Sequence, residues 1–478
     1  MLKKNNKITD ALTYLYIGLP MMIFLIGWVR WYISVPVCLI LLYSFFTAMR
    51  KPDPAAFVIE KSHLRTIFIA FLIICGWVYL SGIGGLVYQN ADHISRNRLY
   101  DLLVNNPWPV LKTVEFEDGV QTRLLSYYIC FFLPSALVGK VFGMAAGFCF
   151  QAVWAVFGVV LVYLKISERL NRFGIVPLIV FMLFSGLDIL GCALLGIDVF
   201  GMKFTNHIEF WGGYQFSSHT TMLFWVFHQA IYGWLLTLEI LRQKDNRHAV
   251  MIASFGLLTS TFAFVGLLPF LGYRVLLNFR EKMKTASPKK ALADLFSIEN
   301  ILAGGAVGLI SFIYLHSNNF SGALHLNLPT NRHDLYIYLL FMLVEVGVYA
   351  MALLRDQERN PLFWISLGVL CVCPLIQVGE VQDFCMRASI PSLLVLCLLV
   401  TESFFNYSRK KDRVRFAALL AVFIIGCITP MHEIVRTCIG TNSFNGQLRY
   451  FDEKRFFFAT DNYSSDTENN LFMQYLAK

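Results

Sequence analysis

The sequence has 478 residues, of which 57% are hydrophobic, 15% aromatic and only 15% charged. Soluble domains carry about 25% charged residues. A water-soluble fold is therefore not expected to bury this much apolar surface. The formal net charge of +9 does not indicate nucleic acid, because most basic residues lie in short segments between apolar runs. That placement is typical of membrane orientation. We predict an all-α polytopic transmembrane bundle in a lipid bilayer, with no nucleic-acid partner.

Thirteen apolar runs follow one another along the chain, and most approach the length that crosses about 30 Å of hydrocarbon. They predict about 11–14 spans. The runs are 12–29, 31–48, 66–84, 125–143, 146–164, 174–196, 220–240, 249–280, 301–315, 335–354, 361–378, 390–406 and 416–430. The run 249–280 is long and contains Pro269, so we expect a tight hairpin of two short helices there.

Lysine and arginine set the orientation. With the N-terminus in the cytoplasm, the cytoplasmic segments hold 26 of the 40 basic residues and the outer segments hold 13. A transmembrane domain, 1–430, then precedes an extracytoplasmic tail, 431–478. The expected outer loops are 85–124, 197–219, 316–334 and 379–389. The expected location is a bacterial cytoplasmic membrane, with the active site facing the outside of the cell.

Residues 125–164 leave a problem of parity. If 165–173 is cytoplasmic, these residues must cross the membrane once. We favour a re-entrant or interfacial segment at 125–143, which contains Pro134, Gly139 and Lys140, and a crossing at 146–164. The alternative is two crossings, which would place 165–173 outside.

The first outer loop carries polar residues at helical spacing. Asp92 and His93 follow the third apolar run, and Arg96, Asn97 and Asp101 come next. Asp92 and Arg96 would share one face of a short helix. Leucines on its other side would let this helix lie on the membrane surface. An ordinary solvated loop with an interfacial helix is the simpler interpretation.

Two stretches carry a family resemblance, QNADHISRNRLYDLLVNNPWPV and YYICFFLPSALVGKVFG. They resemble the acidic-loop region of the GT-C superfamily, which are multi-pass glycosyltransferases that use polyprenyl-phosphate sugars. The resemblance covers about 85–165. It implies a polyprenyl-phosphate-linked sugar as donor, a glycan or lipid acceptor, and Asp92 as general base. This chain has a single Asp followed by His93 where the family has DxD or ExD, so the identity of the base and any divalent metal requirement stay open.

The chemistry suits such a loop. Inverting sugar transfer needs a carboxylate that takes a proton from the acceptor hydroxyl, and neutral imidazole at His93 is the main rival. The leaving lipid phosphate needs cations. We expect no zinc site or disulfide framework, because the 11 cysteines lie mostly in apolar runs without CxxC spacing.

The second outer loop mixes aromatic and hydrogen-bonding residues. His207, Glu209, Trp211 and His219 are candidate sugar or acceptor ligands, together with Arg96, Asn97 and Asp101 from the first loop. Sugars bind through ring stacking and polar contacts. An interfacial aromatic belt is the competing explanation.

The third outer loop places Asp383 and Arg387 four residues apart, where they can pair. We expect Arg387 to bind the donor phosphate with help from Lys140, and Asp383 to contact sugar. A snorkelling salt bridge is the alternative. Asp188 and Glu345 are further charges inside apolar runs, where ionisable residues are costly.

Together these features predict a membrane glycosyltransferase that moves a sugar from a polyprenyl phosphate to an extracytoplasmic glycan or lipid. The alternatives are a flippase or transporter of a lipid-linked saccharide, a polysaccharide polymerase or ligase, and a non-catalytic scaffold. The donor sugar, the acceptor and the oligomeric state are not determined by the sequence.

Overall fold

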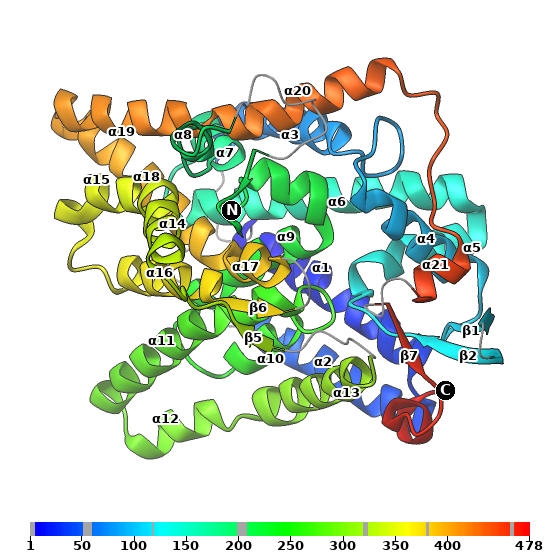
Figure 1. The fold of residues 1–478 in the computed structure, drawn as a ribbon. Coiled ribbons are helices and arrows are strands. Elements are labelled where there is room, and N and C mark those ends of the chain that lie inside the picture. The colour runs from blue at the N-terminus through cyan, green and yellow to red at the C-terminus, as the bar shows by residue number, and fades with distance from the viewer. Residues whose placement is uncertain are drawn as a thin grey trace.

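The computed structural model describes residues 5–50, 60–116, 119–197, 208–318, 324–378, 382–458 and 463–478. Within these ranges, 11 helices are long and apolar enough to cross a membrane, and two shorter apolar helices accompany them. The prediction of an all-α polytopic bundle with 11–14 spans is therefore confirmed, and the protein is a multi-pass membrane protein (Figure 1).

The helices are α1 (Asn5–Trp28), α2 (Trp31–Arg50), α3 (Lys61–Leu80), α4 (Asp92–Asn105), α5 (Leu133–Phe142), α6 (Met144–Arg169), α7 (Ile175–Leu183), α8 (Asp188–Leu194), α9 (His219–Arg242), α10 (Ala249–Ser254), α11 (Thr261–Thr285), α12 (Pro288–Leu295), α13 (Gly305–His316), α14 (Arg332–Met342), α15 (Val348–Gln357), α16 (Pro361–Val372), α17 (Asp383–Ala388), α18 (Ile390–Lys410), α19 (Arg413–Gly426), α20 (Ile428–Asn442) and α21 (Glu453–Phe458). The strands are β1 (Leu111–Phe116), β2 (Gly119–Leu125), β3 (Phe210–Trp211), β4 (Tyr214–Gln215), β5 (Leu324–Leu326), β6 (Ile376–Val378) and β7 (Ser464–Asp466).

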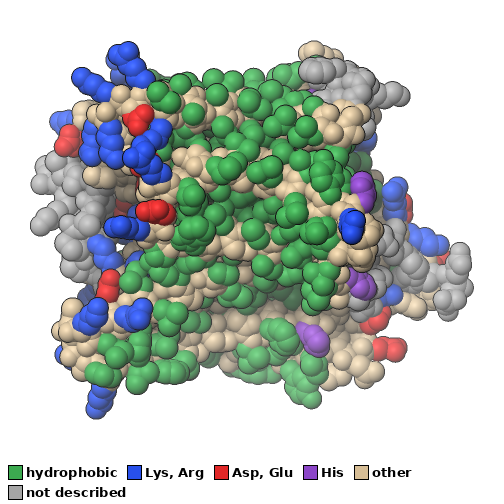
Figure 2. Space-filling model, turned by 60° about the vertical axis from the view of Figure 1, so that its left-hand side comes forward, with side chains coloured by type: hydrophobic (Ala, Val, Ile, Leu, Met, Phe, Trp, Pro, Cys, Tyr) green, Lys and Arg blue, Asp and Glu red, His purple; other side chains and the backbone are tan. Residues whose placement is uncertain are grey.

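A broad apolar belt separates two polar ends of the molecule (Figure 2). One end, which we name the basic side, carries many lysines and arginines (Figure 2). The opposite end, the loop side, carries β1, β2 and β7, which lie together near the C-terminus (Figure 1). This arrangement is the one expected of a bundle that exposes hydrophobic side chains to lipid and charges to water.

A buried ion network ties three helices together at the basic side. Lys165 on α6 contacts Asp10 on α1 at 2.6 Å and Glu239 on α9 at 2.7 Å, and Arg242 contacts Asp10 at 2.6 Å. The segment after α6 therefore lies on the same side as the N-terminus.

This placement answers the parity problem of residues 125–164. Helix α6 crosses once, whereas α5 has 10 residues and extends only about 15 Å, too short to span the bilayer. Both β2 and the end of α5 lie on the loop side, so the favoured interpretation, one crossing preceded by a non-crossing segment, agrees with the structure.

The expected hairpin at 249–280 has different proportions. Only α10 is short, and α11 is a 25-residue helix that contains Pro269 in its interior. The reversal comes earlier, at 255–260, where the hydroxyls of Thr259 and Ser260 donate to backbone carbonyls. Proline is tolerated inside spanning helices where neighbouring groups satisfy the freed backbone, so it did not mark the turn.

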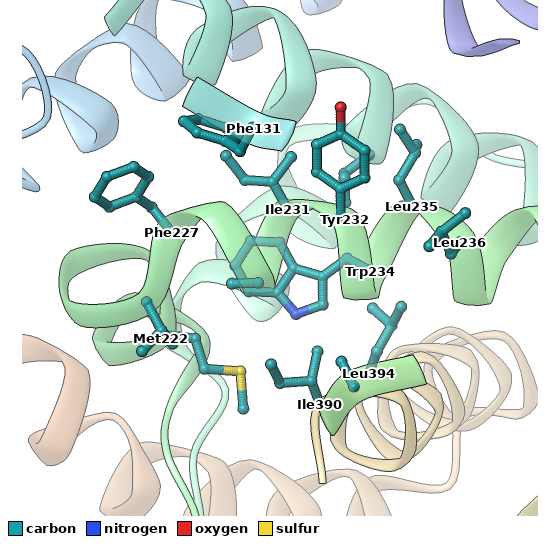
Figure 3. Packing of buried hydrophobic residues seen from close by; sticks show 14 of the residues in the cluster. Phe131, Met222, Phe227, Ile231, Tyr232, Trp234, Leu235, Leu236, Ile390 and Leu394 are labelled. Carbon is teal, nitrogen blue, oxygen red and sulfur yellow. The ribbon is translucent and has the colours of Figure 1, made fainter. Parts of the chain in front are cut away.

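Helix α9 forms the centre of the bundle, and its side chains are almost all buried. Figure 3 shows Trp234 of α9 surrounded by apolar residues, with Phe131 on one side and Ile390 and Leu394 of α18 on the other. Near its loop-side end α9 is kinked at Val226, whose φ of −133° and ψ of 36° are not helical. The kink frees backbone groups that the first loop then binds.

The loop side contains more structure than interfacial helices alone. In loop 85–124, α4 is followed by the antiparallel strands β1 and β2, and β7 of the tail extends that sheet in the order β1-β2-β7. The leucines of α4, Leu99, Leu102 and Leu103, are fully buried against the protein. Helix α20 continues to Asn442, so the tail emerges beyond the expected residue 430.

Candidate functional site

Helix α4 begins at Asp92 because Asn90 holds its first turn. The Asn90 carboxamide oxygen accepts from the Asp92 backbone N–H at 3.1 Å, and its amide donates to the Phe224 carbonyl at 2.8 Å. Phe224 lies just before the α9 kink, where a carbonyl is available for such a bond. The kink in α9 therefore fixes the position of Asp92 at the loop side.

Asp92 and Arg96 form an ion pair along one face of α4. The distance from Arg96 Nη2 to Asp92 Oδ2 is 2.8 Å, and the Arg96 side chain is 6% exposed while that of Asp92 is 38% exposed. Within the part of the chain that the structure describes, Nε and Nη1 of Arg96 have no hydrogen-bond partner. A buried guanidinium with spare donors is a site that an anion would satisfy.

A second pair of the same kind lies on α17. Arg387 Nη1 is 2.5 Å from Asp383 Oδ1, with side-chain exposures of 7% and 38%. Nε of Arg387 has no hydrogen-bond partner among the described residues. Helix α17 can pack this closely on α11 because Gly266 lacks a side chain, and a Cβ there would lie 1.9 Å from the Ala388 carbonyl oxygen.

A cavity of about 220 Å³ opens beside this pair, and we name it the tyrosine–arginine pocket. Its polar wall consists of Asp383, Arg387, Tyr127, Tyr128 and Tyr463. The remaining wall is mainly apolar and comes from Thr261, Phe262, Leu315, Asn318 and Val378. The pocket thus lies where several apolar helices reach the loop side.

The first ion pair is electrostatically linked to this pocket through Tyr463. The Tyr463 hydroxyl donates to Ser95 Oγ on α4 at 3.2 Å. Burial raises the pKa of Tyr463, while the charges of Arg96 and Arg387 both lower it, so the two guanidinium groups act on the same phenol. Asp92 itself is not part of the pocket wall, whereas Asp383 is.

Two neighbouring tyrosines supply hydroxyl donors to the pocket. Burial raises the pKa of Tyr128 to about 12 against the lowering influence of Arg387, so this phenol stays protonated at neutral pH. The Tyr127 ring lies 4.5 Å from the Tyr463 ring. A pocket lined by one arginine, three phenols and a carboxylate can bind a phosphate ester and can also accept a proton.

His93, the expected rival base, is buried and hydrogen-bonded to backbone carbonyls. Its Nε2 lies 3.2 Å from both the Ser81 and the Phe224 carbonyl oxygens, which can only accept, so Nε2 carries the proton. Burial lowers the pKa of His93 to about 3, with Arg96 lowering it further, so the ring is neutral. Stacked on Phe227, the imidazole joins the end of α3 to the α9 kink.

Two other first-loop predictions, and Lys140 of the next segment, lie away from the pocket. Asn97 donates to the Gln89 side chain and to the Arg449 carbonyl, which attaches α4 to the tail. Asp101 faces the opposite side of α4 and pairs with Arg98 at 2.6 Å. Lys140 donates to the carbonyls of Val104 and Asn106 at the far end of α4 and is not brought to Arg387.

The second-loop predictions are buried in a separate cluster. Glu209 is fully buried and accepts from the Ser218 N–H at 3.0 Å, and Trp211 donates to Glu345 at 3.1 Å. His219 packs between aromatic rings and bonds the Phe181 carbonyl at 2.7 Å. These side chains support the loop instead of lining the tyrosine–arginine pocket. His207 lies outside the described residues.

The intramembrane carboxyl of Asp188 belongs to the same cluster. Its Oδ2 accepts from Ser185 at 3.0 Å and from Thr429 at 2.9 Å. A Cβ on Gly186 would lie 1.7 Å from Glu345 Oε2. The backbone can approach this carboxyl so closely only because residue 186 has no side chain. Within the described ranges, no group of three or more His, Cys, Asp and Glu is arranged to hold a metal.

Sequence reasoning missed the three tyrosines. Tyr127 and Tyr128 stand in the aromatic pair that carries the resemblance, but nothing local marks them as a pocket wall. Tyr463 comes from the tail and is brought to α4 and β2 by the pairing of β7. Comparison of the chain with protein-family models, curated proteins and solved structures finds no match.

Proposed function

We propose that this membrane protein is a glycosyltransferase of the GT-C type. It would move a sugar from a polyprenyl-phosphate donor to a glycan or lipid acceptor, with inversion, on the extracytoplasmic face of a bacterial inner membrane. The observation that carries the proposal is the pair of buried arginines, Arg96 and Arg387. Each is paired with a half-exposed carboxylate, each keeps an unsatisfied N–H among the described residues, and both act on Tyr463 beside one pocket.

The arginines support binding of the donor phosphate. A planar guanidinium donates two parallel hydrogen bonds to phosphate oxygens, and burial strengthens such charge-assisted bonds. The position of the pocket at the ends of spanning helices suits a carrier whose lipid chain stays in the bilayer while its phosphate reaches the surface. The phenols of Tyr127 and Tyr128 would add neutral donors to the same phosphate or to sugar hydroxyls.

The proposed transfer is a single displacement. The acceptor oxygen forms a bond to the anomeric carbon of the sugar, and the bond from that carbon to the phosphate oxygen breaks with its electron pair going to the phosphate. The proton of the acceptor hydroxyl goes to a carboxylate. Asp92 is our first candidate for this base. Asp383 is the rival, because it lines the pocket directly.

Sugar transfer by the protein in proteoliposomes tests the proposal. The donors are radiolabelled polyprenyl-phosphate hexoses, and both the released polyprenyl phosphate and the labelled product are measured. Loss of the base should lower turnover by about 10²–10⁴-fold while donor binding persists. We expect this of Asp92→Asn. His93→Gln should instead lower stability, because it disturbs the contact between α3 and α9.

The outcomes separate the alternatives. If Asp383→Asn is inactive and Asp92→Asn is normal, the base is Asp383. If both variants transfer sugar at the wild-type rate, or if the protein moves the carrier across the bilayer without releasing phosphate, the glycosyltransferase proposal is contradicted. The second of these results would favour a flippase.

A further inference from the structure

A second, larger cavity lies on the loop side, next to the start of α17. Its volume is about 860 Å³, within the range of about 300–1,000 Å³ typical of ligand sites. Strands β3 and β4 form one wall, and the segment leading into α14 forms another. Gln377 of β6 and Gln382, which directly precedes Asp383, close the side toward the tyrosine–arginine pocket. We name this space the amide cavity.

The lining of the amide cavity differs in charge from that of the tyrosine–arginine pocket. No Lys or Arg occurs among its described lining residues, and its polar side chains are mostly the amides Asn327, Gln377 and Gln382 with His333. Among the described lining residues the carboxylate is Asp334, which already accepts from Thr330 and Asn331 through Oδ2. The described part of the lining offers no counter-ion to a phosphate, and its amides suit a neutral ligand with many hydroxyl groups.

Two further features point to a ligand. Gln382 is 8% exposed and its carboxamide oxygen has no hydrogen-bond partner among the described residues, so it lacks a donor that a hydroxyl would supply. Phe210 is 51% exposed on the cavity wall, and Tyr214 beside it is nearly buried. An exposed ring next to amide groups is the combination that binds the C–H face and the hydroxyls of a pyranose.

Helix α17 joins the two cavities. Its Cys385 thiol donates to the Gln215 carbonyl of β4 at 3.3 Å, so the helix that carries Arg387 is anchored to the strand pair that walls the amide cavity. Gln382 faces the amide cavity, and the next residue, Asp383, lines the tyrosine–arginine pocket. The two cavities are therefore lined by adjacent residues of the chain, so a ligand in one would lie next to a ligand in the other.

We propose that the amide cavity binds an uncharged saccharide. The further statement that this saccharide is the acceptor of the transfer rests on the proposed function. The binding of a saccharide in the amide cavity does not. The hydroxyl to be glycosylated would lie toward Asp383, and the rest of the saccharide would occupy the space between Phe210 and Gln382.

Saccharide binding to the protein in lipid nanodiscs tests this inference. The probes are the neutral tetrasaccharides maltotetraose, cellotetraose, mannotetraose and chitotetraose, with tetragalacturonate as an anionic counterpart, observed by saturation-transfer NMR and calorimetry. We expect at least one neutral probe to bind, and Phe210→Ala and Gln382→Leu each to weaken that binding by tenfold or more. Tyr475→Ala, which removes another exposed ring of the loop side, should leave it unchanged.

The readouts also distinguish this inference from the proposed function. Arg387→Ala should leave saccharide binding intact while it weakens binding of polyprenyl phosphate. Binding of no neutral probe, tighter binding of tetragalacturonate, or affinities that both cavity variants leave unchanged would overturn the inference even if sugar transfer is observed. Saccharide binding that depends on Phe210 and Gln382 in a protein without transferase activity would support the cavity and contradict the proposed function.

Discussion

Arg387 combines burial, a single carboxylate partner and an Nε without a hydrogen-bond partner among the described residues. Holding a guanidinium in this state is costly unless an anion completes its hydrogen bonds. Arg96 has the same character on α4, but only Arg387 lines the pocket. At the scale of residues, the affinity for an anionic headgroup should therefore depend most on Arg387.

We expect Arg387→Ala to weaken binding of polyprenyl phosphate by about tenfold or more, because a charged hydrogen bond contributes about 1.5–3 kcal/mol. Arg387→Lys should recover only part of the loss, since the planar fork is absent. Arg332→Ala removes an exposed arginine of the loop side and serves as the control. Equal affinities of wild type and Arg387→Ala, measured by calorimetry in nanodiscs, would exclude this role.

Glu209 gives a prediction for pH. Burial raises the pKa of its carboxyl from 4.5 to about 8, with further upward contributions from Asp188 and Glu433. The folded state therefore binds a proton that the unfolded state has lost, so the stability contribution is present below pH 4.5 and is lost as pH rises through about 8. The thermal unfolding midpoint should fall over that window.

Glu209→Gln supplies the control for this effect. The amide keeps an oxygen for the Ser218 N–H and cannot ionise, so the variant should match wild type near pH 5 and exceed it near pH 9. Scanning calorimetry in detergent at several pH values measures the difference. Parallel curves for the two proteins would show that Glu209 does not titrate in this range.

At the scale of elements, α17 is placed by its contact with α11. The close approach of Ala388 to Gly266 leaves no room for a side chain, so α17 and its Arg387 depend on one glycine. The tail acts in a similar way on the other wall, because β7 pairs with β2 and brings Tyr463 to the pocket. Two elements far apart in the sequence thus form one site.

Gly266→Ala is expected to lower stability by about 1–3 kcal/mol through overpacking and to weaken binding of polyprenyl phosphate by displacing Arg387. Gly272→Ala lies on the same helix with nothing within 4 Å of the added Cβ, so it should be neutral or stabilising. Both variants are compared by thermal unfolding and by donor binding. Wild-type donor affinity in Gly266→Ala would show that α17 is held by other contacts.

At the scale of the whole molecule, the basic side is joined by the network of Lys165, Arg242, Asp10, Glu168 and Glu239. Lys165 is 1% exposed and lies 2.6 Å from Asp10 and 2.7 Å from Glu239, which is fully buried. These contacts connect α1, α6 and α9, the helices on which the central packing depends. Removing the central cation would leave buried carboxylates without sufficient compensation.

Lys165→Met should therefore destabilise the protein by about 3–5 kcal/mol, the usual cost of an uncompensated buried charge. The exposed Lys289→Met should have little effect, because surface charges contribute little. Adding Glu239→Gln to Lys165→Met should restore part of the loss. A thermal unfolding midpoint of Lys165→Met equal to that of wild type would contradict a structural role for the network.

The features that the residues alone predict are local or additive. The length of each apolar run sets the number of spans, and the placement of Lys and Arg sorts the connecting segments onto two sides, so the bundle and the single crossing at α6 were predicted. The pairs Asp92–Arg96 and Asp383–Arg387 were also predicted, because helical spacing alone brings residues four apart onto one face.

Which loops come into contact depends on the packing of distant elements. Tyr463 joins the pocket through strand pairing with β2, and the α9 kink supplies a carbonyl to which Nε2–H of His93 donates. Lys140 was separated from Arg387 by the length of α4, and Glu209, Trp211 and His219 were buried by the packing of helices around the second loop. Contacts between residues hundreds of positions apart depend on packing of the whole bundle, which no local pattern encodes.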